Sequence, residues 1–272
     1  WRLEDYENLY STAKAPSAND TEVLQEIEAS VRKVGERYQV RVPWKDPNEV
    51  IPNNRYQAEA RLRAKADKLR RYPQEFAEYN EAIESYEKNG FAEVVPECEI
   101  WDSTKKIFYL MHHAVFHPRK HKRRVVFNAK AMFRGISLNA MIKRCPDLLE
   151  SVGILIRFRN GKIAVAADIA AFFHAVQTYP EDCDRHRYLW FTDSTMRDIK
   201  TLRMTSFMFG GASSQACSIA ARNAALDDAV VEKVITSLQC EIAKRNTYSD
   251  DSLTPHETPD EAVNDTVAIA LA

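Results

Sequence analysis

The sequence predicts an α+β fold in which strands pair through turns and the helices stand apart from them. Two pairs of strand-like runs, at residues 108–128 and 187–209, are each joined by a short polar or basic turn without a helix between their members. Long helical patterns occur separately, at residues 55–90 and 214–238. Because hairpin-linked strands form antiparallel sheets and segregated helices cover them, the α+β class follows.

The composition is that of a globular protein. The chain has 272 residues, 45% of them hydrophobic, which is enough for one large domain or two ordinary ones. The formal net charge of -1 gives no overall sign of an anionic partner, so such a sign must come from local clustering. Five cysteines without a CxxC pair favour reduced thiols inside a cell. The longest apolar run, residues 163–173, is too short to span a membrane.

The first hundred residues predict a mainly helical lead-in segment, which we bound at residues 1–100. A helix is expected over residues 22–37, and a charged helical pair over residues 55–90, where Pro73 begins the second helix and Gly90 ends it. Acidic and basic residues interleave in this pair, so a solvated helical hairpin is favoured over a basic ridge for nucleic acid. Since the chain starts without an initiator methionine, we expect a fragment of a longer protein.

The next segment, residues 101–160, is marked by charge of one sign. Residues 103–146 contain no Asp or Glu but eleven Lys or Arg residues. A one-signed stretch in a near-neutral chain requires an anionic partner or an acidic patch elsewhere in the fold. The runs IFYLMHHAVFHP, RKHKR and RVVFNA predict two strands joined by a basic tip. A zinc site is disfavoured, because a strand and turn would not gather the histidines at positions 112, 113, 117 and 121.

Carboxylates end two separate strand patterns. Asp168 follows a small apolar run, residues 163–167, of the kind expected for a strand buried on both faces. Asp250 and Asp251 lie in NTYSDDSL, which has the pattern of a hairpin tip. A polar turn alone would explain the pair, since Asp bonds to its own backbone in turns. A buried carboxylate at the end of a strand is harder to explain by packing, because it costs several kcal/mol when unpaired.

These carboxylates are candidate cation ligands. Two carboxylates about 4 Å apart repel by about 4 kcal/mol at an effective dielectric of 20, so cations between them are expected. Asp168 and Asp250 suit Mg2+, which takes one or two carboxylates plus substrate phosphates. Two such ions support phosphoryl transfer, and the basic hairpin suits the polyphosphate. Nucleotidyl transfer is therefore favoured, with a non-catalytic nucleic-acid-binding protein and a two-metal nuclease as alternatives. The nuclease is disfavoured because it has no triphosphate to hold.

Five segments, in order, carry a resemblance to a known family: YLMHHAVFHP with RRVVFNAKAMFRGISLNAMI, PDLLESVGILIRFR, AADIAAFFHAV, RMTSFMFGGASSQACSIAARNAA and YSDD. Over residues 40–272 the chain resembles the reverse transcriptase of BEL/Pao-type LTR retrotransposons. The resemblance implies a right-hand polymerase with fingers at residues 101–160, a palm at 161–272 whose antiparallel sheet packs on helices, and a truncated thumb. It implies an RNA-directed DNA polymerase that transfers nucleotides from dNTPs to a primer 3'-OH.

The resemblance also implies roles for individual residues. Asp168 and Asp250 match the metal-binding aspartates, and Asp251 is a less critical catalytic neighbour. The nucleotide and primer contacts are Arg124 on the triphosphate with Lys120 or Lys122 as its partner, Phe173 against the ribose 2'-OH, Phe209 and Gly210 against the nucleotide and template, and Tyr248 near the primer end. Departures from the family pattern are Met111, Asn128, Gln215, Ser249 and Ser252. None removes a metal ligand, and they leave open a degenerate nucleic-acid-binding remnant.

Cofactors, partners and location follow from the same resemblance. Two Mg2+ ions are expected, with Mn2+ as an alternative. The partners are an RNA template, a DNA primer and dNTPs, without a membrane. The parent polyprotein would carry a protease, an RNase H and an integrase, and the protein would be intracellular, in the cytoplasm and within virus-like particles.

Overall fold

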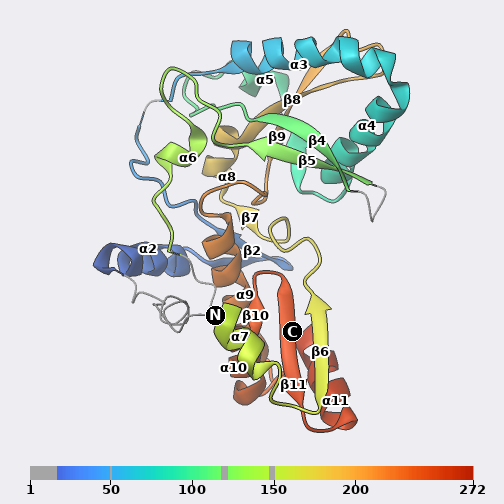
Figure 1. Cartoon of the computed structure of the whole chain (residues 1–272). Helices are drawn as coiled ribbons and strands as arrows, with labels where there is room; N and C mark the ends of the chain where they lie inside the picture. Colours follow the sequence, from blue (N-terminus) through green and yellow to red (C-terminus); the bar gives the residue numbers. More distant parts are fainter. Residues whose placement is uncertain (1–16, 50, 118–121, 147–150, 272) are drawn as a thin grey trace, which may run out of the picture.

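The computed structural model describes residues 17–49, 51–117, 122–146 and 151–271, and the statements below concern these residues. Their elements form an upper and a lower group, joined through a narrower middle (Figure 1). Small antiparallel sheets and separate helices make up both groups, so the predicted α+β class is confirmed. The upper group contains α3 (Arg55–Arg71), α4 (Pro73–Lys88), β3 (Ala92–Val94), α5 (Glu97–Ile100), β4 (Met111–His117), β5 (Lys122–Asn128), β8 (Arg187–Phe191) and β9 (Ile199–Met204).

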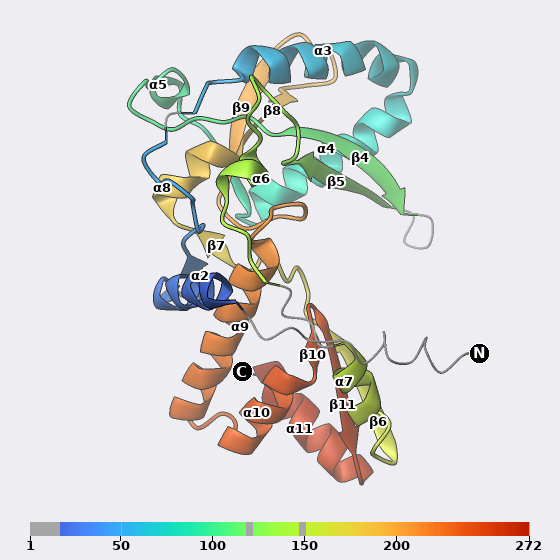
Figure 2. The same ribbon diagram turned by 60° about the vertical axis from the view of Figure 1, so that its left-hand side comes forward.

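The lower group is built on a sheet whose strand order is β10, β11, β6. Helices α7, α10 and α11 pack against this sheet, and α9 runs down to it from the middle of the molecule (Figure 2). Its elements are α7 (Ser151–Arg157), β6 (Ile163–Asp168), α9 (Ser214–Val231), α10 (Ser237–Arg245), β10 (Thr247–Tyr248), β11 (Asp251–His256) and α11 (Pro259–Leu271). Between the groups lie α2 (Ala18–Ala29), β1 (Arg32–Val34), β2 (Arg37–Val40), α6 (Leu138–Met141), β7 (Gln177–Thr178), α8 (Pro180–Cys183) and the 3-10 turn η1 (Asp184–His186).

The first described helix is shorter than the sequence predicts. Helix α2 starts at a Ser17 capping box and ends at Ala29, whereas the prediction extended the helix to residue 37. The chain instead turns through Gly35, whose φ of 62° is left-handed, and pairs β1 with β2. A glycine adopts this conformation without steric cost, so a tight hairpin replaces the last helical turns. The helical-hairpin prediction is confirmed, because α4 begins at Pro73 and ends before Gly90.

Helices α3 and α4 cover the sheet formed by β3, β9 and β8. Trp190 of β8 is fully buried and lies against Phe76 and Tyr79 of α4, with ring centroids 5.9 and 4.5 Å away. Because β8 and β9 pair with β3, residues 187–204 belong to the upper group and not with β6. Hairpin β4–β5 lies beside them and confirms the predicted pairing of the two strands, whereas residues 118–121 of the predicted basic tip lie outside the described residues.

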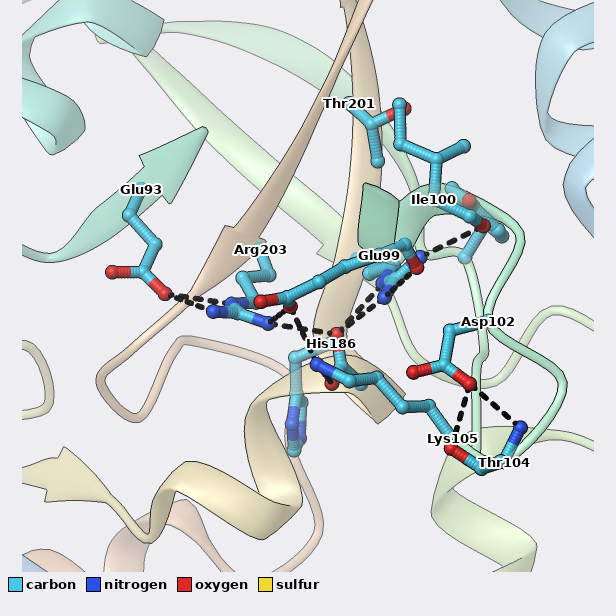
Figure 3. A network of polar contacts seen from close by, with 12 residues as sticks. Glu93, Glu99, Ile100, Asp102, Thr104, Lys105, His186, Thr201 and Arg203 are labelled. Atoms are coloured by element: carbon cyan, nitrogen blue, oxygen red, sulfur yellow. Dashed lines mark hydrogen bonds and ion pairs between the residues drawn. The ribbon is translucent and has the colours of Figure 1, made fainter. Parts of the chain in front are cut away.

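A network of ion pairs ties the base of the upper group together (Figure 3). The buried guanidinium of Arg187 donates to the carboxylate of Asp184 at 2.8 and 2.7 Å and to the carbonyls of Glu99 and Ile100. Arg203 and Lys105 complete the network, because each forms ion pairs with the carboxylates of Glu99 and Asp184. The network therefore joins α5, η1, β8 and β9 by charge-assisted hydrogen bonds, which are stronger than neutral ones.

Strand β6 differs from its prediction as a strand buried on both faces. It is the edge strand of its sheet, and Ala164, Ala166 and Asp168 are exposed on one face. The other face packs on helices, as the buried Thr254 and His256 of the neighbouring β11 show. A run of small apolar residues does not distinguish these two environments, because alanine occurs in both.

Candidate active site

The segment NTYSDDSL forms a hairpin tip, as predicted. Tyr248 of β10 pairs with Asp251 of β11, which leaves Ser249 and Asp250 as a two-residue loop. Ser249 has a φ of 56°, and a left-handed first loop residue is what a type II′ turn requires. Such a conformation is strained for a residue with a side chain and persists only where the surroundings fix it.

Strand β6 places Asp168 directly across from Asp251. The amide of Ile169 donates to the carbonyl of Asp250 at 2.7 Å, so residues 169 and 250 form a hydrogen-bonded pair. Because bonded and non-bonded pairs alternate in an antiparallel ladder, Asp168 and Asp251 form the close, non-hydrogen-bonded kind, with Cβ atoms about 5 Å apart. The three aspartates predicted from the sequence are thus brought together at one end of the sheet.

Two exposed carboxylates directly opposite each other make this end of the sheet unfavourable without a cation. Asp168 and Asp251 are both exposed, and Tyr248 lies beside them in the same cross-strand row with 38% of its surface exposed. Within the described residues, no ion pair involves any of the three aspartates. Like charges directly opposite on neighbouring strands destabilise a sheet. Because Asp168 is exposed, the predicted cost of burying its carboxylate does not apply. The repulsion between the opposed carboxylates is the argument for a cation here.

The side chains supply oxygen donors of the kind that a hard cation prefers, but only part of its ligand shell. In the described part of the chain, no three His, Cys, Asp or Glu side chains are arranged to hold a metal ion together. The aspartate cluster offers oxygen donors from opposite strands, and oxygen is the ligand that Mg2+ prefers. Mg2+ commonly takes only one or two carboxylates and fills its shell with water and substrate phosphates. The residues present therefore fit an ion that arrives with a phosphorylated substrate.

Phe173 and Phe209, two of the predicted nucleotide contacts, meet each other. Their rings are perpendicular, with centroids 4.6 Å apart, and Phe209 is 51% exposed. Ala171 has a φ of 53° and turns the chain so that Phe172 is buried while Phe173 faces Phe209. Only one of the two consecutive phenylalanines is therefore available to a ligand.

Arg124 lines a pocket of about 320 Å3 together with Phe209, Tyr86 and His174. Arg124 is an exposed residue, and no ion pair within the described residues involves it. Arg123 differs, because it forms ion pairs with the acidic face of α4 at 2.8 and 3.6 Å. Of the predicted lysine partners, Lys120 lies outside the described residues, and for Lys122 only the backbone pairing with His117 is described.

Gly210 lies in a turn that only glycine fits well. Its φ is 94°, and a Cβ there would lie 3.0 Å from the carbonyl oxygen of Phe127 in β5. Asn139 clamps the same turn: its amide donates to the carbonyl of Gly210 at 2.9 Å and its oxygen accepts from Ala212 at 3.0 Å. No pattern in the sequence distinguished Asn139, although it lies within the SLNA part of a motif that carries the resemblance.

Comparison with solved structures places this geometry in a known fold. Neither a protein-family model nor a curated protein matches the sequence. A crystal structure of the prototype foamy virus protease-reverse transcriptase (CSH mutant) matches over 100% of this chain, with a TM-score of 0.54 and 17% identity. The match covers 32% of that chain, so the present chain spans about a third of its length. The chain has a reverse-transcriptase fold.

The reverse-transcriptase fold confirms the coarser part of the resemblance, whereas membership of the BEL/Pao class stays a prediction. At 17% identity the likeness concerns the fold. Among the described residues, no helix is both long and apolar enough to cross a membrane.

One histidine of the hairpin, His112, belongs to the core of this reverse-transcriptase fold. His112 is buried, and its Nδ1 lies 2.6 Å from the hydroxyl of Tyr79 while its Nε2 lies 2.9 Å from the carbonyl of Leu189. Burial lowers the pKa of His112 to about 4, so the ring is neutral at neutral pH. The contacts of His112 are therefore those of a hydrogen-bonded core residue.

The one-signed stretch is neutralised in part by acids elsewhere in the reverse-transcriptase fold. Lys105, Arg123 and Lys143 form ion pairs with acidic residues outside residues 103–146. Arg124 and Lys106 form none within the described residues. Acids elsewhere in the fold therefore account for Lys105, Arg123 and Lys143. An anionic partner for the remaining cations stays a prediction.

Proposed function

We propose that the chain is a reverse-transcriptase module of a BEL/Pao-type retrotransposon polyprotein. It would transfer nucleotides from dNTPs to a primer 3'-OH on an RNA template. One observation carries the proposal: in a reverse-transcriptase fold, Asp168 lies opposite Asp251 and one position from Asp250 at an exposed sheet end. The BEL/Pao class rests on the sequence motifs.

Asp168 and Asp250 would hold the metal ions, and Asp251 would add negative charge beside them. When bound, two Mg2+ ions, or Mn2+ in their place, supply activation of the attacking hydroxyl and stabilisation of the leaving oxygen. The chain's own contribution would be to hold Asp168 and the Asp250–Asp251 pair in a fixed register before substrate arrives. The strained turn at Ser249 supports this fixed geometry.

The pocket beside hairpin β4–β5 would bind the incoming nucleotide. Arg124 would hold the triphosphate, with Lys120 or Lys122 as its partner, because arginine matches phosphate oxygens in a bidentate manner. Phe173 would lie against the sugar, supported by Phe209. In this assignment hairpin β4–β5 belongs to the fingers, residues 101–160, and the sheet that carries the aspartates belongs to the palm, residues 161–272, with Tyr248 beside the primer end. The nucleic-acid partners, the polyprotein neighbours and the cytoplasmic location are part of the same proposal.

Primer extension tests the proposed function. The purified chain is incubated with a DNA primer annealed to an RNA template, dNTPs and either Mg2+ or EDTA. We expect Mg2+-dependent extension that copies the template. The alternative is a remnant that binds nucleic acid without chemistry. The buried Gln215 amide nitrogen, which has no hydrogen-bond partner among the described residues, favours it. Salt-sensitive binding without extension would support the remnant and reject the polymerase.

Replacement of Phe173 should relax the choice of sugar. Removing the bulk of the ring in Phe173→Val opens space for a 2'-OH, the group that distinguishes ribonucleotides. We expect the ratio of kcat/KM for dNTP over that for rNTP to fall by about 10- to 100-fold, the range that one steric group in a pocket provides. The ratio is insensitive to loss of folded protein, because one sample serves both substrates. An unchanged ratio would remove Phe173 from the sugar contact.

A further inference from the structure

We propose that a second cavity, remote from the aspartates, binds a small polyphosphate anion. The cavity has a volume of about 850 Å3 and is formed mainly by residues 41–48, 104–106 and 180–185. In both overall views these segments lie to the left, whereas β6 and hairpin β4–β5 lie to the right (Figures 1 and 2). The proposal concerns a separate site and does not depend on the polymerase assignment.

Charged side chains of both signs line the cavity, but most of its acids are already paired. The carboxylate of Asp182 accepts from the indole of Trp44 at 2.6 Å and from the amide of Val42 at 3.1 Å. Asp184 belongs to the ion-pair network of Figure 3. Glu26 forms an ion pair with Lys143. The remaining acid of the lining is Glu181, which is exposed.

Two cations of the lining converge on one neutral oxygen. The ammonium of Lys106 and the guanidinium of Arg185 both donate to the carbonyl of Pro47. Within the described residues, neither has a carboxylate oxygen within 4.0 Å. Two positive groups that share a single acceptor repel each other, and an anion bound between them would relieve this repulsion.

Arg185 is only 3% exposed, yet its hydrogen bonding is incomplete. Its Nε has no hydrogen-bond partner within the described residues. The guanidinium stacks over the ring of Trp44 at 4.0 Å from the ring centroid, which fixes its orientation beside the cavity. A buried donor without an acceptor is costly and calls for an explanation. An anion in the adjoining cavity would compensate the positive charge of this buried guanidinium.

Two more cations of the lining lack acidic partners in the described part of the chain. Lys45 donates only to the carbonyl of Ala140, at 2.8 Å. Arg41 stacks over the ring of Tyr179, at 4.6 Å from the ring centroid. Together with Lys106 and Arg185, four cations of the lining therefore have no ion pair within the described residues. The acids of the lining without an ion pair are Glu181 and Asp182, and Asp182 accepts from neutral donors.

A small polyphosphate fits these features better than a strand of nucleic acid does. The cavity volume falls within the range of about 300 to 1,000 Å3 typical of small-molecule sites. Lysine and arginine are the usual partners of phosphate oxygens. A nucleic-acid strand would use a basic stripe that follows its backbone, whereas Glu26 and Glu181 border the cations here.

Calorimetric titration with inorganic tripolyphosphate, in buffer containing EDTA, tests this proposal. We expect saturable binding of one anion per chain, weakened at least tenfold in Lys45→Gln/Lys106→Gln. Both lysines are outside the core, and circular dichroism checks folding. If the double variant is unfolded, Lys106→Gln alone replaces it, with an expected loss of at least threefold. The matched control is Lys162→Gln, which removes an exposed cation of the lower group and should leave the affinity within twofold.

Four results would overturn the proposal. The first is absence of saturable binding to the wild-type chain. The second is an equal loss in Lys162→Gln, which would indicate a general effect of net charge. The third is loss of binding in Arg124→Gln with retention in the cavity variants, which would assign the anion to the hairpin. The fourth is displacement of tripolyphosphate by a short single-stranded RNA at a lower concentration, which would identify a nucleic-acid strand as the ligand of the cavity.

Discussion

Asp168→Asn and Asp250→Asn should each reduce primer extension at least a thousandfold. Each replacement removes one negative charge and one oxygen donor from the sheet end at which the proposed ions would bind. A thousandfold loss corresponds to about 4 kcal/mol of activation free energy, a size expected when stabilisation of charge by a metal ion is lost. The measurement is the rate of single-nucleotide addition under saturating primer-template and dNTP.

Two further variants make this prediction specific. Asp198→Asn removes an exposed carboxylate from the β8–β9 turn and should leave the rate within twofold. Asp251→Asn should cause a smaller loss than Asp250→Asn if Asp250 is the ligand, although Asp251 lies directly opposite Asp168. Wild-type rates in Asp168→Asn and Asp250→Asn would exclude the proposed reaction at this site.

Asp184→Asn should produce the largest loss of stability. Asp184 is the carboxylate partner of Arg187, whose side chain is completely buried. Removing one member of a buried pair leaves a charge without compensation in the interior, which costs about 3–5 kcal/mol. The free energy of unfolding, measured with urea at pH 7, should fall by this amount. Glu93→Gln is the matched control, because this partner of Arg203 is half-exposed and should cost at most about 1 kcal/mol.

The same network predicts how stability depends on pH. Burial favours the neutral form of Asp184, but bonds to Arg187 and Arg203 outweigh it and hold its pKa below the ordinary range. Bonds to Lys105 and Arg203 likewise lower the pKa of Glu99. Carboxyl groups whose pKa is lowered in the folded state stabilise the fold at pH values above their unfolded pKa of about 4. This stability is lost as the pH falls through their pKa in the folded state. The difference between wild type and Asp184→Asn should therefore shrink below about pH 4. A difference independent of pH would contradict this account.

Local signals in the sequence predicted the parts of the fold that depend on neighbouring residues. Pro73 and Gly90 bounded a helix because proline and glycine act on the backbone directly. The polar segment around Asp250 likewise indicated a hairpin tip, because its residues also act on the local backbone. The helix over residues 22–37 was predicted too long, because its apolar spacing outweighed the turn signal of Gly35.

Features that depend on distant residues were not accessible in the same way. The exposure of β6 depends on its position at a sheet edge, which its own residues do not encode. The pairing of Asp168 with Asp251 joins strands far apart in the sequence, so the sequence indicated the residues but not which of the two later aspartates faces the first. The buried position of Arg187 was likewise hidden, because two of its partners, the carbonyls of Glu99 and Ile100, come from the distant helix α5.

The central claim is that Asp168 and Asp250 hold a divalent cation together. Anomalous scattering from crystals of the chain grown with Mn2+, primer-template and a dNTP tests it most directly. The account predicts an anomalous peak within coordination distance of both carboxylates and of the triphosphate. Carboxylates that point away from each other, or a peak bound by neither aspartate, would contradict it.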